Sequence, residues 1–183
     1  MNISEEKKLI EKAKTDLKWF GEVYEVYFDK IYTFVSYMTR NKEVAEDIVS
    51  QTFEKAMLNI DTFEYRGYSF GAWLYRIARN LVYDRSKSKK DNNYSAEEIY
   101  DFVSDESISL VEKIEDQEMI ELIRLGLEEL KEEQKEVLVL RYVEGYSIKE
   151  VCEILSKSED SVKSLAKRGI KILKQRVIEK YEG

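Results

Sequence analysis

Proline and histidine are absent from the 183-residue chain, which has only seven glycines and one cysteine. Without proline and with few glycines, almost nothing interrupts a helix, whereas the abundant Leu, Ile, Glu and Lys favour helices. A single cysteine excludes an internal disulfide, and the lack of histidine excludes a Cys/His zinc site and histidine-dependent acid–base catalysis. We therefore expect an all-α protein that holds no metal ion and no cofactor.

Long apolar runs are also missing. Residues 1–14 mix acidic and basic side chains and lack the apolar core of a signal peptide. No later stretch approaches the roughly 18 apolar residues of a membrane span. We therefore expect the protein to stay in the cytoplasm, with 43% apolar residues to fill one mid-sized core or two small ones.

The net charge of −7 argues at first against nucleic acid, because Lys and Arg supply most phosphate contacts. The charge is, however, segregated along the chain. The charged residues of 91–121 are all acidic apart from Lys113, whereas those of 163–180 are all basic apart from Glu179. The acidic run and the polar stretch that leads into it predict a linker, so we expect two small helical domains, residues 1–90 and 117–183, joined by an acidic linker of residues 91–116.

Two amphipathic helices are predicted in the first domain. The apolar face of the first recurs at three- and four-residue steps and holds Ala45, Ile48, Val49, Thr52, Phe53, Ala56 and Ile60. Another face of this helix presents Asp47, Ser50, Gln51 and Glu54. The second helix has a core stripe of Phe70, Trp73, Leu74, Ile77, Ala78, Leu81 and Val82. Its other side is basic, amide-bearing and aromatic, with Arg76, Arg79, Asn80 and Tyr83.

The segment between these helices is rich in aromatic residues. Phe63, Tyr65, Tyr68 and Phe70 alternate there with charge and glycine, a pattern too broken for a strand. Such side chains either close over a core or form a stacking platform for unpaired bases.

The second domain contains a predicted helix-turn-helix. Ser147 followed by Glu150 fits a capping box, which starts a short helix over residues 148–155, and Ser156-Lys157-Ser158 makes the turn. The last helix has a predicted buried stripe of Val162, Ala166, Gly169, Ile170, Leu173 and Val177, and a basic exposed face. A basic face alone is more often solvated surface, but the preceding turn favours insertion of this helix into a major groove.

Three stretches together resemble the extracytoplasmic-function sigma factors, the minimal branch of the sigma-70 family. They are AEDIVSQTFEKA (45–56), FGAWLYRIARNLVYDRSKSKK (70–90) and VLVLRYVEGYSIKEVCEILSKSEDSVKSLAKRGIKIL (137–173). The resemblance implies a protein that gives RNA polymerase its promoter specificity at transcription initiation. It also implies core RNA polymerase (its β′ clamp helices and β flap) and promoter DNA as partners, and leaves open an anti-sigma factor.

The same resemblance assigns roles to individual residues. It implies that the β′ clamp helices contact Asp47, Ser50, Gln51 and Glu54. It implies that the minus-ten element is recognised and melted by Phe63, Tyr65, Arg76, Arg79, Asn80 and Tyr83. It implies that the minus-thirty-five element is read by Arg141, Lys163, Ser164, Leu165, Lys167 and Arg168. Leu165 stands where a basic residue is frequent, so we expect it to offer an apolar contact to a thymine methyl group.

Other functions remain open from the sequence. An autonomous helix-turn-helix regulator would bind a specific duplex without polymerase, and a protein-binding adaptor would support no transcription. An enzyme is the least favoured alternative, because no nucleophile–base pair, phosphate loop or metal-ligand cluster is present.

Overall fold

The computed structural model describes the backbone of residues 2–65, 68–88, 123 and 126–181. Every regular element in these ranges is a helix, which confirms the predicted all-α class. The chain forms two compact units, residues 1–103 and 104–183. The predicted linker of residues 91–116 lies outside the described residues. No helix in the described ranges combines the length and apolar character that a membrane span needs.

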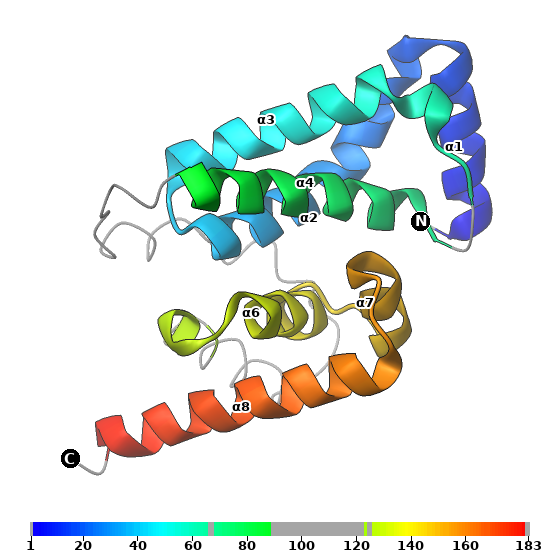
Figure 1. Cartoon of the computed structure of the whole chain (residues 1–183). Coiled ribbons are helices and arrows are strands. Elements are labelled where there is room, and N and C mark those ends of the chain that lie inside the picture. The colour runs from blue at the N-terminus through cyan, green and yellow to red at the C-terminus, as the bar shows by residue number, and fades with distance from the viewer. Residues whose placement is uncertain (1, 66–67, 89–122, 124–125, 182–183) are drawn as a thin grey trace. The chain divides into compact units, whose positions relative to one another are not determined.

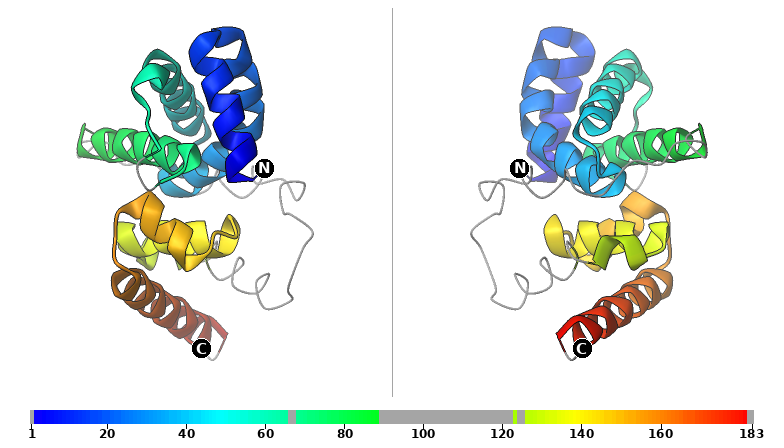
Figure 2. Two further views of the ribbon diagram at one scale, coloured as in Figure 1. Left: turned by 90° about the vertical axis from the view of Figure 1, so that its right-hand side faces the viewer. Right: turned by 90° about the vertical axis from the view of Figure 1, so that its left-hand side faces the viewer.

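The first unit is a small helical bundle (Figure 1). Its elements are α1 (Ile3–Thr15), the 3₁₀ turn η1 (Leu17–Trp19), α2 (Phe20–Thr39), α3 (Lys42–Leu58), the 3₁₀ turn η2 (Ile60–Thr62) and α4 (Phe70–Ser88). Helices α2, α3 and α4 pack against one another and α1 packs on α2, as Figure 2 shows from two further sides. Asparagine side chains cap two of these helices. Asn2 forms a capping box with Glu5 at the start of α1, and Asn41 accepts a 2.9 Å hydrogen bond from the Val44 amide at the start of α3.

The core of this unit confirms one predicted stripe and corrects the other. All the predicted apolar residues of the 45–60 segment are buried. In α4 the buried arc is centred on Leu74, Ala78 and Val82, so it includes Tyr75, which packs edge-on against Phe34 at a centroid distance of 5.3 Å. Trp73 lies at the edge of that arc and is only half-buried. Ile77 is half-buried as well. The expectation that Trp73 and Ile77 are core residues is therefore wrong.

The second unit contains the predicted helix-turn-helix. Its elements are the 3₁₀ turn η5 (Leu127–Glu129), α6 (Glu132–Leu138), the π-helical turn η6 (Val139–Val143), α7 (Ile148–Leu155) and α8 (Glu159–Tyr181). The predicted capping box is present, since the Ser147 hydroxyl accepts from the Glu150 amide and the Glu150 carboxylate accepts from the Ser147 amide. Ser156 ends α7 in the left-handed conformation, with φ 53°. The predicted helix of residues 148–155 and its turn are confirmed.

Helix α8 packs on α6 and α7 through one stripe of its surface. The buried residues of this stripe are Val162, Leu165, Gly169 and Leu173, whereas Ala166 and Ile170 are half-buried. At Gly169 the helices approach closely, because a Cβ atom there would lie 2.8 Å from Leu138 Cδ1. Three predicted residues, Val162, Gly169 and Leu173, are therefore buried, and the stripe also includes Leu165, which was not predicted to be buried. The side chain of Val177 lies outside the described residues.

Candidate nucleic-acid interfaces

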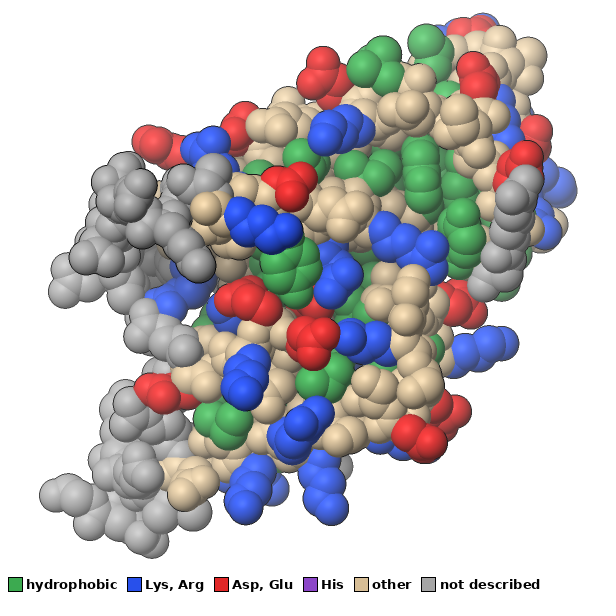
Figure 3. Space-filling model, in the orientation of Figure 1, with side chains coloured by type: hydrophobic (Ala, Val, Ile, Leu, Met, Phe, Trp, Pro, Cys, Tyr) green, Lys and Arg blue, Asp and Glu red, His purple; other side chains and the backbone are tan. Residues whose placement is uncertain are grey.

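Helix α8 presents a polar and basic face to solvent. Lys163, Ser164, Lys167 and Arg168 are all exposed, and Figure 3 shows Lys and Arg side chains along α8. Lys163 forms a hydrogen-bonded ion pair with Glu159 one turn earlier. The hydrogen bond to Glu159 raises the pKa of Lys163 above its ordinary value. An exposed pair of this kind is weak. Lys163 can therefore exchange Glu159 for a phosphate or a base edge.

Leu165 does not belong to this face. Its side chain is only 5% exposed, because it follows Val162 by three residues and precedes Gly169 by four, and so lies on the packed stripe of α8. The predicted contact between Leu165 and a thymine methyl group is wrong for this conformation. The side chain contributes to the core of the unit and not to its surface.

Arg141 comes from the π-helical turn η6 and lies beside the basic face. With Lys163, Lys167 and Tyr142 it lines a cavity of about 320 Å³ between η6 and α8. Its guanidinium Nη1 donates a 3.2 Å hydrogen bond to the Tyr146 carbonyl. This bond holds the charge at the edge of the helix-turn-helix, a suitable place for a phosphate contact.

A second polar face lies on α4. Arg76 stacks over the Tyr68 ring at 4.3 Å, and Arg79 stacks over the Tyr83 ring at 4.9 Å. Asn80 is exposed on the same helix. The four α4 residues that the sequence predicts for the minus-ten element therefore share one side of α4, where guanidinium groups and aromatic rings are already stacked.

Phe63 is buried and does not form part of an exposed stacking platform. Its ring is 2% exposed and lies 4.8 Å from Tyr65, 5.1 Å from Phe70 and 5.3 Å from Trp73. The ring cannot stack on a base in this conformation, so the predicted direct contact of Phe63 with the minus-ten element is wrong for this conformation. Tyr65 is half-buried beside it, and burial, followed by the charge of Glu6, raises the pKa of the Tyr65 hydroxyl well above its ordinary value.

Asn80 opens onto a cavity of about 340 Å³ between α4 and the end of α3. The cavity is lined by Lys55, Asn59, Thr62, Trp73, Ile77 and Asn80. It combines an aromatic wall with amide, hydroxyl and ammonium groups, which suits a planar, hydrogen-bonding ligand such as a base. Lys55, Asn59 and Thr62 were not predicted from the sequence. Their polar side chains lie at the end of α3 and just after it, but their position beside Asn80 depends on the tertiary fold.

The polar face of α3 borders an aromatic cavity. Asp47, Ser50 and Glu54 are exposed and Gln51 is half-buried. Of these residues, Ser50 and Glu54 also line a cavity of about 510 Å³, whose other walls are Phe20, Tyr24, Phe28, Tyr32, Glu46, Val49, Phe53 and Met57. The α2 aromatic residues were not predicted to form a site, although Tyr24, Phe28 and Tyr32 recur at four-residue steps. This cavity combines an apolar, mainly aromatic wall with the carboxylates of Glu46 and Glu54.

Comparison with known proteins identifies the family of the chain. A model of sigma-70 region 2 matches residues 23–91, and a model of sigma-70 region 4 matches residues 120–173. The ECF RNA polymerase sigma factor SigW of Bacillus subtilis is 30% identical over 97% of this chain and 98% of its own length. The ECF RNA polymerase sigma factor BldN of Streptomyces coelicolor is 33% identical over 90% of this chain, which spans 63% of that relative's length.

Solved structures share the fold. The sigma factor RpoE, in complex with the anti-sigma factor NepR from Bartonella quintana, has a TM-score of 0.61 and 23% identity over 85% of this chain and 94% of its own. CnrH, in complex with the cytosolic domain of CnrY, has a TM-score of 0.68 and 20% identity over 94% of this chain and 96% of its own. The region 2 and region 4 matches occur in sequence order, and SigW matches along nearly its full length. The chain therefore belongs to the ECF sigma factors of the sigma-70 family, which direct RNA polymerase in transcription initiation.

Proposed function

We propose that the two units of this sigma factor divide promoter recognition between them. The second unit, which we assign to residues 117–183, reads the duplex at the minus-thirty-five element. The first unit, residues 1–90, binds core polymerase and captures unpaired bases of the minus-ten element. The observation that carries the proposal is the presence of two different polar surfaces, one on the second helix of a helix-turn-helix and one around the Asn80 cavity.

The basic face of α8 is the part that enters the major groove. Lys163, Ser164, Lys167 and Arg168 lie on exposed positions of the second helix of the motif, which is the helix that contacts base edges in this class of protein. Arg141 supplies a phosphate contact from the neighbouring η6 turn. Phosphate contacts orient the helix, and base-edge contacts from α8 give it sequence preference.

The Asn80 cavity receives a base of the minus-ten element after that base leaves the stack. Unstacking costs a few kcal/mol, so captured bases must find compensating contacts. The amide of Asn80 can hydrogen-bond a base edge, and Trp73 offers an aromatic surface next to it. The neighbouring nucleotides then contact Arg76, Arg79 and Tyr83 on α4 and Tyr65 in the segment before it.

Core polymerase binds the polar face of α3 and the aromatic cavity beside it. We assign Asp47, Ser50, Gln51 and Glu54 to contacts with the β′ clamp helices, and place the second unit at the β flap. Apolar cavity walls can bury the partner's side chains, while the carboxylates at the rim select basic ones. The two structural relatives named above are bound to an anti-sigma factor or to a cytosolic domain, so a regulatory protein of this kind is a further proposed partner. This assignment places the protein in the cytoplasm, as a DNA-binding regulator and not an enzyme.

Run-off transcription on genomic fragments tests whether the protein recognises promoters only together with core polymerase. Purified bacterial core RNA polymerase should initiate at new, mappable start sites only when the protein is added. The protein alone should not bind those fragments tightly. Tight and specific binding without polymerase, with no new start sites, would instead indicate an autonomous regulator.

A further inference from the structure

Helix α1 lies outside the region 2 match, which begins at residue 23, yet it contacts both ends of the segment that joins η2 to α4. That segment begins next to Thr62, a wall of the Asn80 cavity, and ends at the first residue of α4. The contacts come from Glu6, Lys7 and Lys14. Through these contacts α1 can influence the shape of the Asn80 cavity.

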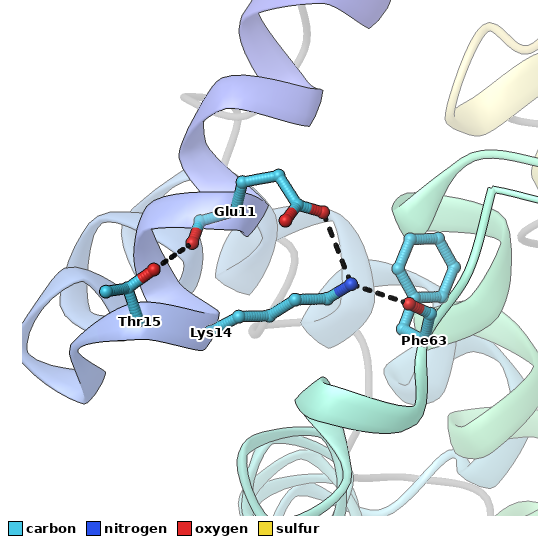
Figure 4. Close-up of polar contacts among 4 residues, drawn as sticks. All are labelled: Glu11, Lys14, Thr15 and Phe63. Carbon is cyan, nitrogen blue, oxygen red and sulfur yellow. Dashed lines mark hydrogen bonds and ion pairs between the residues drawn. The ribbon is translucent and has the colours of Figure 1, made fainter.

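Lys14 makes the contact at the first end of the segment (Figure 4). Its ammonium Nζ donates a 2.8 Å hydrogen bond to the backbone carbonyl of Phe63 and a 3.2 Å hydrogen bond to Glu11 Oε1. The Lys14 side chain is only 21% exposed, so the bond to Phe63 is shielded from competing water. Hydrogen bonds from a charged donor are stronger than neutral ones. Phe63 is extended, with φ −70° and ψ 129°, and Lys14 thus fixes a carbonyl beyond the end of η2.

Glu6 makes the contact at the other end. One carboxylate oxygen accepts a 3.0 Å hydrogen bond from the Phe70 amide, and the other accepts from the Tyr27 hydroxyl. Glu6 is 6% exposed, and a carboxylate buried to this extent needs such partners. The Phe70 amide is one of the first N–H groups of α4, which have no acceptor inside the helix. Lys7 adds a third contact, with its Nζ 5.0 Å from the centre of the Tyr65 ring.

The Phe63 carbonyl is coupled to two walls of the Asn80 cavity. Phe63 is bonded directly to Thr62, and its ring packs 5.3 Å from Trp73. Both Thr62 and Trp73 line the cavity. Any displacement of Phe63 therefore moves one wall through the backbone and presses on another through the ring. Glu6 bonds the Tyr27 hydroxyl on α2 and the Phe70 amide on α4, so the position of α1, which carries Lys14, is fixed relative to both helices.

We propose that Lys14 is a positioning residue for recognition of the minus-ten element. It contacts no base. It holds Phe63 so that Thr62 and Trp73 keep the spacing that the captured base requires. This inference rests on the proposed role of Asn80 and its cavity, and it extends promoter selectivity to a helix that precedes the matched region.

The test compares three lysine variants of the full chain in transcription with bacterial core polymerase. Lys14→Met removes the donor but keeps the aliphatic stem, Lys14→Arg keeps a donor, and Lys8→Met is the control at an exposed position of the same helix. A promoter library varied only at the minus-ten element is the template. We expect Lys14→Met to lower open-complex formation roughly 3- to 10-fold, as for loss of one hydrogen bond, and to change the ranking of minus-ten sequences. Lys14→Arg should restore most of the ranking, and Lys8→Met should match wild type.

A purely structural role predicts a different result. If Lys14→Met lowered transcription equally for every minus-ten sequence, in proportion to a lower melting temperature, the positioning role would be refuted. Asn80→Ala, measured in parallel, distinguishes failure of the role of Lys14 from failure of the proposed base capture in the Asn80 cavity. Normal ranking for Lys14→Met with a defect for Asn80→Ala would overturn only the role of Lys14. Normal behaviour of both variants would overturn the assignment of the cavity as well.

Discussion

Replacing Leu165 with alanine should destabilise the second unit and leave the first unit unchanged. The leucine is 5% exposed and lies on the packed stripe of α8 with Val162 and Leu173. Truncation of a buried leucine costs about 2–5 kcal/mol, because apolar burial is lost and a cavity remains. The free energy of unfolding of a typical domain is only about 5–15 kcal/mol, so the loss is a large fraction of the total.

Two spectroscopic probes can separate the units. Both tryptophans, Trp19 and Trp73, belong to the first unit, so tryptophan fluorescence reports that unit alone, whereas far-UV circular dichroism reports helices of both. The free energy of unfolding of a small unit falls by about 1–1.5 kcal/mol for each molar of urea. A loss of about 3 kcal/mol of this free energy therefore lowers the urea midpoint of the second unit by roughly 2–3 M. The shift should appear in circular dichroism and not in fluorescence. Ser164→Ala, at the exposed neighbouring position, should shift neither curve. An unchanged dichroism curve for Leu165→Ala would refute the burial of this side chain.

Three further predictions concern the proposed interfaces. Asp47→Arg should weaken pull-down by isolated β′ clamp helices without unfolding the first unit, because exposed charge changes cost little stability; undiminished binding would exclude this face. Asn80→Ala should reduce permanganate-detected melting of a duplex promoter, with a smaller defect on a template already mismatched at the minus-ten element; unchanged melting would leave Asn80 without a role in base capture. Arg141→Ala should weaken binding to all upstream elements alike and reduce by about one the slope of log binding constant against log salt concentration. Arg168→Ala should instead cost about 1–3 kcal/mol of binding free energy and relax the preference at one position of the element. Equal effects of the two variants on every sequence would mean that Arg168 does not contact a base edge.

Local patterns were sufficient to predict α3, α4, α7 and α8, whereas α1 and α2 were not predicted. The Ser147–Glu150 capping box, the apolar steps from Ala45 to Ile60 and the turn at Ser156 all depend on neighbours within a few residues. The same logic contained the signal for Leu165, because its three- and four-residue spacing from Val162 and Gly169 puts it on the buried stripe. Its assignment to DNA came from the resemblance to the family, and the periodicity of α8 argues against it.

Other features depend on residues far apart in the chain. Phe63 is buried by Phe70 and Trp73, and its carbonyl is bound by Lys14, which is 49 residues earlier. The Glu6 carboxylate caps an amide 64 residues later. No local spacing encodes such contacts, because they exist only after the helices pack. For the same reason the sequence pointed to Asn80 but not to Lys55, Asn59 and Thr62 beside it.

The division of promoter recognition between the two units is tested most directly by comparing two variants on two promoter libraries. One library varies only the minus-thirty-five element, the other only the minus-ten element, and both are transcribed with core polymerase and wild type, Lys167→Ala or Asn80→Ala protein. We predict that Lys167→Ala changes the ranking of upstream sequences and leaves the ranking at the minus-ten element intact, and that Asn80→Ala does the reverse. If both variants changed the ranking of the same element, or neither changed any ranking, the proposed division between the two units would be contradicted.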